Sequence, residues 1–91
     1  MSESVVRSAQ FSVGTAAVLV GVGNTGGSRI LLHQDGAGNH QIYFGGSAVT
    51  TSTGFLIRKG AEVDVYLPEG VRLYAVASSA ETLYVLQTGG R

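Results

Sequence analysis

The chain has 91 residues, no cysteine, and six basic and six acidic residues that cancel to a formal net charge of zero. This length favours one compact domain, the lack of cysteine excludes disulfides and thiolate metal sites, and the balanced charge argues against nucleic acid as a partner. Charged residues make up only 13% of the chain, against about a quarter in an average domain. Part of the surface is therefore expected to contact protein.

The N-terminal stretch MSESVVRSAQ lacks the basic and then apolar layout of a signal peptide. No apolar run approaches the roughly 18 residues needed to cross a bilayer. We therefore expect a cytoplasmic product with no membrane partner. Residues 1–10 are predicted to be an N-terminal arm that adds a strand to an adjacent subunit or lies on a partner, and residues 11–91 to be the folded domain.

Short strands joined by tight turns are predicted along the chain. The sequence has fourteen glycines and one proline, and no window keeps the 3.6-residue period of an amphipathic helix. A period of two is clearest in AEVDVYL (61–67), whose aliphatic residues face one side and whose charged residues and tyrosine face the other. The predicted strands are residues 5–13, 16–22, 29–34, 41–44, 55–57, 61–67, 72–77 and 82–86.

Turn signals recur about every 8 to 12 residues, a spacing typical of sandwiches and barrels. The predicted fold class is therefore all-β: a single-domain β-sandwich, jelly-roll-like, of short antiparallel strands. LYAV (73–76) and LYVL (83–86) are predicted to form a closing hairpin with Leu73 and Leu83 in the core. The predicted core residues are Val63, Val65, Leu67, Leu73 and Val85.

Gly21, Gly23 and Gly26 in VLVGVGNTGGSRI (18–30) spell G-x-G-x-x-G after an apolar run, which is the fingerprint of a dinucleotide-binding turn. Such a site also needs a helix that opens at the third glycine and an acidic residue about 20 positions further on. The following RILLHQ is too short for that helix and rich in strand formers, and GGSAVT occupies the place of the acidic residue. We therefore interpret the stretch as a hairpin loop.

His33, His40 and Asp35 in HQDGAGNH are candidate zinc ligands, but a zinc site needs a third firm ligand and a fixed geometry. The two histidines flank an Asp-Gly-Ala-Gly stretch that is expected to be flexible, so we interpret HQDGAGNH as a solvated hairpin. A Ser-His-Asp triad needs a nucleophile elbow, and the sequence has no G-x-S-x-G. Glu62 and Asp64 share the polar side of one strand, where solvation or an ion pair to a neighbouring strand explains them. We expect no catalytic residue, metal or cofactor, and hence no enzyme.

Two stretches are candidates for protein contacts. GGSAVTTSTG (45–54) has three glycines, five hydroxyl residues and no charge, which suits close backbone packing against another chain and equally suits an exposed loop. Arg58 and Lys59 form a basic turn that is either solvated or binds a partner's carboxylates.

The aromatic residues offer a different interpretation, a stacking platform for a sugar. Spread along the chain and lacking tryptophan, they fit a division between core and interface better. They are Tyr43, Phe44, Tyr66, Tyr74 and Tyr84.

The order IYFGGSAVTTSTGFLIRKGAEVDVYLPEGVRLYAVASSAETLYVLQTG (42–89) resembles small virion proteins of tailed bacteriophages. Those chains carry a VYIGG strand, VTTSTG, a leucine-containing strand, a Gly-Glu turn before an alternating strand, LYA and a last strand. VGTAAVLV (13–20) is similar to their VGTSATLL, so the resemblance covers about residues 11–89. The chain departs from the pattern at RKGAE (58–62) and in lacking an appended receptor-binding domain, which argues against a host-recognition fibre.

The resemblance implies a capsid decoration (cement) or minor head protein. Such a protein is a β-sandwich, commonly a homotrimer, made in the host cytoplasm and bound to the major capsid protein on the outside of the virion shell. A tail or fibre structural component and a carbohydrate-binding module stay open as alternatives. The candidate contact residues are Val5, Val6, Arg7, Gly46, Ser47, Thr50, Thr51, Ser52, Arg58 and Lys59.

Overall fold

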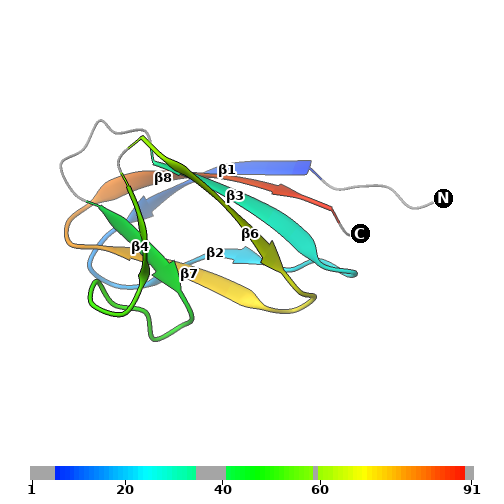
Figure 1. Cartoon of the computed structure of the whole chain (residues 1–91), viewed down its shortest axis with the longest axis horizontal. Helices are drawn as coiled ribbons and strands as arrows, with labels where there is room; N and C mark the ends of the chain where they lie inside the picture. The colour runs from blue at the N-terminus through cyan, green and yellow to red at the C-terminus, as the bar shows by residue number, and fades with distance from the viewer. Residues whose placement is uncertain (1–5, 35–40, 59, 90–91) are drawn as a thin grey trace.

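The computed structural model describes residues 6–34, 41–58 and 60–89, which form eight β-strands in two four-stranded sheets (Figure 1). In these ranges there is no helix long and apolar enough to cross a membrane. The strands are β1 (Val6–Val13), β2 (Val18–Val22), β3 (Ser28–Gln34), β4 (Ile42–Gly45), β5 (Phe55–Ile57), β6 (Glu62–Leu67), β7 (Arg72–Ala77) and β8 (Glu81–Thr88).

The strand order is that of a jelly roll. One sheet has the order β1-β8-β3-β6 and the other β2-β7-β4-β5, and every neighbouring pair is antiparallel. Each connection crosses from one sheet to the other except that between β4 and β5, which pair directly. Two sheets of four strands connected in this way form the double-sheet jelly roll. The predicted all-β sandwich is confirmed.

Three predicted hairpins are wrong. β7 and β8 follow each other in sequence but belong to different sheets. The same holds for β2 and β3 on either side of the glycine-rich stretch, and for β3 and β4 on either side of the HQDGAGNH stretch. LYAV and LYVL are similar because both strands direct their leucine toward the core: Leu73 and Leu83 are both buried between the sheets. A short loop and two alternating strands are thus compatible with a crossing between sheets as well as with a hairpin.

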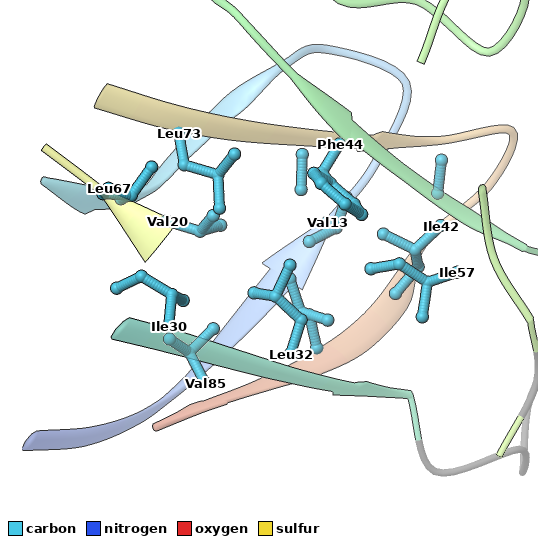
Figure 2. Packing of buried hydrophobic residues seen from close by; sticks show 13 residues of the cluster. Val13, Val20, Ile30, Leu32, Ile42, Phe44, Ile57, Leu67, Leu73 and Val85 are labelled. Carbon is cyan, nitrogen blue, oxygen red and sulfur yellow. The ribbon is translucent and has the colours of Figure 1, made fainter. Parts of the chain in front are cut away.

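The core lies between the two sheets. Side chains from both sheets point toward one another in Figure 2, among them Ile30 and Leu32 from β3 and Ile42 from β4, which are fully buried. Val63 and Val65 are only partly buried, because β6 is an edge strand. The other predicted core residues are buried as expected: Leu67, Leu73 and Val85.

Residues 6–10 belong to the sandwich. The sequence predicts a strand over residues 5–13 but also assigns residues 1–10 to an N-terminal arm, and in the structure Val6 to Gln10 are the first part of β1 and pair with Thr88 to Tyr84 of β8. These residues show no alternation of apolar and polar types because they form the outer end of an edge strand, where both faces are largely exposed. The rest of the predicted arm, residues 1–5, lies outside the described residues.

Candidate protein-binding surfaces

The glycine-rich connection between β2 and β3 packs against the connection between β6 and β7. The amide of Gly23 donates to the carbonyl of Val71 (2.9 Å), and the amide of Gly70 donates to the carbonyl of Gly23 (3.0 Å). A Cβ at position 23 would overlap the carbonyl oxygen of Pro68. Glycine is therefore needed here so that two backbones of the same chain approach closely.

The amides of this connection are directed to partners within the chain. A dinucleotide turn presents free amides at the start of a helix, but β3 follows here and the Gly26 amide donates to Oε1 of Glu69 at 3.2 Å. The Gly27 amide donates to the carbonyl of Asn24 at 2.7 Å. Because a carboxylate at this position repels phosphate, the geometry supports a structural role for the G-x-G-x-x-G stretch.

The side chain of Gln87 links β8 to β2 and β3 by hydrogen bonds at the same end of the sandwich. Its Nε2 is buried and donates to the carbonyl of Val22 (2.8 Å) and to Oγ of Ser28 (3.1 Å). The Ser28 Oγ also accepts from the amide of Asn24 (2.8 Å), whose Nδ2 donates to the carbonyl of Gly89 (3.2 Å). The ends of β2 and β8 and the start of β3 are thereby held in one hydrogen-bonded group.

His33 lies on the outer face of the sheet β1-β8-β3-β6. Its Nδ1 is 3.9 Å from Oε2 of Glu62, and its ring packs against Tyr84 with the ring centroids 6.1 Å apart. Within the described part of the chain, no three metal-ligating side chains gather into a candidate metal site. The other two zinc candidates, His40 and Asp35, lie outside the described residues.

Glu62 and Asp64 lie on the open outer face of β6. Oδ1 of Asp64 is 3.6 Å from Nε of Arg29 on the neighbouring strand, and both side chains of this pair are more than half exposed. Glu62 lies 3.9 Å from His33 on the same neighbouring strand, and its side chain is more than half exposed. An ion pair to a neighbouring strand accounts for Asp64 and solvation accounts for Glu62, the two explanations that the sequence offered.

The five aromatic residues of the sugar-platform interpretation are not on one surface. Phe44 is buried in the core. Tyr43 and Tyr74 lie on the outer face of the sheet β2-β7-β4-β5, whereas Tyr66 and Tyr84 lie on the outer face of the other sheet. The structure therefore separates the rings that such a platform has to bring together.

The outer face of the sheet β1-β8-β3-β6, hereafter the exposed sheet face, carries apolar residues at its centre. Leu86 of β8 lies directly opposite Leu31 of β3 and is 37% exposed. From β1 to β6, the row that contains them is Ser8, Leu86, Leu31 and Asp64, and the adjacent row is Gln10, Tyr84, His33 and Glu62.

A shallow hollow of about 600 Å³ covers the centre of this face. Leu31, His33, Tyr84 and Leu86 line it together with residues of β1. The Nδ1 of His33 is enclosed and has no hydrogen-bond partner among the residues that the structure describes, since the Glu62 carboxylate is beyond hydrogen-bond distance. An apolar and aromatic centre with charged residues at one side is the composition found at the core and rim of protein–protein interfaces.

The 45–54 loop packs back on the outer face of its own sheet. Val49 is buried, and it lines a hollow together with Val76, which is buried on the outer face of β7. A Cβ on Gly54 would lie 2.6 Å from Cβ of Tyr43 and 2.8 Å from Cγ2 of Val49. Gly54 therefore permits packing within the chain, whereas the sequence also allowed a role in packing against another chain.

Thr50 closes this loop on itself. Its carbonyl accepts from the amides of Thr53 (3.2 Å) and Gly54 (2.8 Å), and its Oγ1 accepts from the amide of Ser52 (3.2 Å). The Thr50 amide donates in turn to Oγ1 of Thr53 (3.1 Å). Three predicted contact residues of the loop, Thr50, Thr51 and Ser52, are thus exposed on a hydrogen-bonded turn.

The predicted contact residues fall at three separate places, and those that the structure describes are exposed. They are Val6 and Arg7 on β1, Gly46, Ser47, Thr50, Thr51 and Ser52 in the 45–54 loop, and Arg58 after β5. Val5 and Lys59 lie outside the described residues.

Leu31 and Leu86 at the centre of the exposed sheet face were missed as contact residues. Their signal in the sequence is that each occupies the outward phase of a strand whose inward phase already supplies two apolar core residues, Ile30 and Leu32 in β3 and Leu83 and Val85 in β8. Recognising it requires the register, because only the pairing of β3 with β8 brings the two leucines together.

Comparison of this chain with protein-family models, with curated proteins and with solved structures gives no match.

Proposed function

We propose that this protein decorates the outside of a tailed-phage capsid, where it binds the major capsid protein through the exposed sheet face and stabilises the shell. The proposal draws its class of function from the sequence resemblance. The observation that carries the binding site is the pair of leucines, Leu31 and Leu86, which lie side by side on the outer face of a sheet and line an open hollow.

The chemistry of the exposed sheet face suits a flat protein partner. The leucines and Tyr84 supply apolar and aromatic area, while Arg29, Asp64 and Glu62 lie at one side as a charged rim. Association buries such a centre and leaves the rim in contact with water. A ligand of small size would instead need an enclosed cleft, and this hollow is open.

Because the binding sites on a capsid are repeated, the protein can attach firmly even though each contact buries a small surface. A capsid presents the same site many times, and an oligomer such as the proposed homotrimer engages several sites at once. Linked binding raises the overall affinity by about 10² to 10⁴ over that of one contact. A low content of charged residues, 13% of the chain, reduces the desolvation cost of each contact.

Sedimentation tests the proposal. Purified protein is mixed with empty heads of the phage whose genome encodes it, the heads are pelleted, and the bound protein is quantified against its concentration. We expect saturable binding at a fixed ratio to the major capsid protein. The Leu86→Lys variant should bind about tenfold more weakly or worse, as expected for a central interface residue.

Thr82→Lys is the matched control, because Thr82 is exposed on the outer face of the same strand but does not line the hollow. It adds the same charge and should bind like the wild type. Absence of binding to heads, or binding to tails alone, contradicts capsid decoration. Wild-type binding by Leu86→Lys contradicts the assignment of the exposed sheet face, and equal loss in both variants contradicts the assignment of the hollow at its centre.

A further inference from the structure

The four edge strands of the sandwich differ in how well they are protected against pairing with another strand. β2 has five residues and a register shift between Leu19 and Gly21, and β5 has only three residues. β6 carries Glu62 and Asp64 and is followed by Pro68. Short length, bulges, charges and proline are the devices by which natural edges avoid further pairing.

β1 has none of these protections along most of its length. It is eight residues long, pairs with β8 without a register shift, contains no proline and carries one charge, that of Arg7. One side of β1 is paired with β8, and the other side is a sheet edge. The backbone groups on this side are a template for one more strand.

A groove lies beside this edge, between β1 and β2. Ala9 and Phe11 from β1, Leu19 and Val20 from β2 and Val85 from β8 line it, and its volume is about 280 Å³. Phe11 and Val85 belong to the inward phase of their strands; Val85 is part of the buried core, and Phe11 is partly buried against it. A strand added to the β1 edge would place every second side chain over this apolar lining.

Arg7 places a positive charge in the groove, which is complementary to an acidic residue on a bound strand. It lines the same groove two residues before Ala9, and its side chain is exposed with no ion pair to any residue that the structure describes. A guanidinium in this position favours a carboxylate of the occupant, because the two groups form charge-assisted hydrogen bonds.

We infer that the edge of β1 and the adjoining groove bind an extended segment of the partner protein by strand addition, and that this segment carries an acidic residue opposite Arg7. The inference rests on the proposed function in naming the capsid protein as the source of that segment. In an antiparallel arrangement the residues opposite Phe11, Ala9 and Arg7 follow the pattern apolar-x-apolar-x-acidic. The small side chain of Ala9 leaves room for the larger apolar residue that faces it.

The test uses a synthetic peptide and no capsid, so its failure is distinguishable from failure of the proposed function. The isotope-labelled full chain is titrated with acetyl-KTVTVTETK-amide, and binding is followed by amide chemical shifts. We expect shift changes to concentrate on β1 and on the residues that line the groove. Changes confined to β5 or β6, or no change at millimolar peptide, overturn the inference.

A charge exchange tests the role of Arg7. Replacing the peptide's glutamate by lysine (acetyl-KTVTVTKTK-amide) should weaken binding about fivefold, and the Arg7→Glu variant should reverse this preference, since an exposed pair contributes up to about 1 kcal/mol. Arg58→Glu is the control, because Arg58 is exposed outside the groove. Equal binding of both peptides by the wild type overturns the assignment of Arg7. Shift changes on β1 that depend on protein concentration without peptide would instead identify a second copy of the chain as the occupant.

Discussion

Replacing Gly23 by alanine tests the contact between the glycine-rich connection from β2 to β3 and the connection from β6 to β7. The added methyl group overlaps the carbonyl oxygen of Pro68 and lies 2.8 Å from that of Leu67. Both obstacles are backbone atoms, so the loops have to separate, and the two hydrogen bonds of Gly23 to residues 70 and 71 are lost or weakened. With about 1 kcal/mol for each bond and a similar cost for the displaced packing, the free energy of unfolding should fall by about 3 kcal/mol.

Thermal unfolding measures this effect. For a domain of this size, 3 kcal/mol corresponds to a fall in Tm of roughly 12–24 °C. Gly26→Ala is the matched control, because Gly26 has a φ of +85° but open space where a Cβ would lie. Its cost is backbone strain alone, about 1–2 kcal/mol. A fall in Tm for Gly23→Ala that is no larger than that for Gly26→Ala would refute the proposed contact between the loops.

Three further substitutions test other parts of the fold. Leu32→Ala empties a fully buried site and should lower the free energy of unfolding in urea by about 2–5 kcal/mol; a smaller loss would show that the core is less closely packed. Gln87→Leu removes the buried donor that joins β8 to β2 and should cost about 1–3 kcal/mol in the same assay, whereas unchanged stability would contradict its role. Thr50→Val removes the acceptor of the Ser52 amide and should speed hydrogen exchange there, while Thr51→Val should leave that rate unchanged.

The sequence predicts the strands of this protein well because their signal is local. All eight observed strands were expected, with boundaries that agree to within two residues. Alternation in EVDVYL gives the two faces of β6 correctly, since a strand exposes one face and buries the other. The pattern does not show how deeply β6 is buried, because its place at the sheet edge is set by pairing with a distant strand.

The connections and surfaces were less predictable because they depend on register. GNTGGS has the composition of a hairpin turn, yet its glycines serve contacts to residues 68–71, more than 40 positions away in the sequence. Leu31 and Leu86 are also far apart in the sequence, and only the pairing of β3 with β8 brings them together. Residue type alone identified exposed positions such as Arg7 and Thr51, but it did not group them into a surface.

Electron cryomicroscopy of empty heads saturated with the purified protein tests the central claim most directly. The account predicts density for the sandwich on the outside of the shell, with the exposed sheet face and its pair Leu31 and Leu86 against the major capsid protein. Heads without added density, or a sandwich attached with this face directed to solvent, would contradict it.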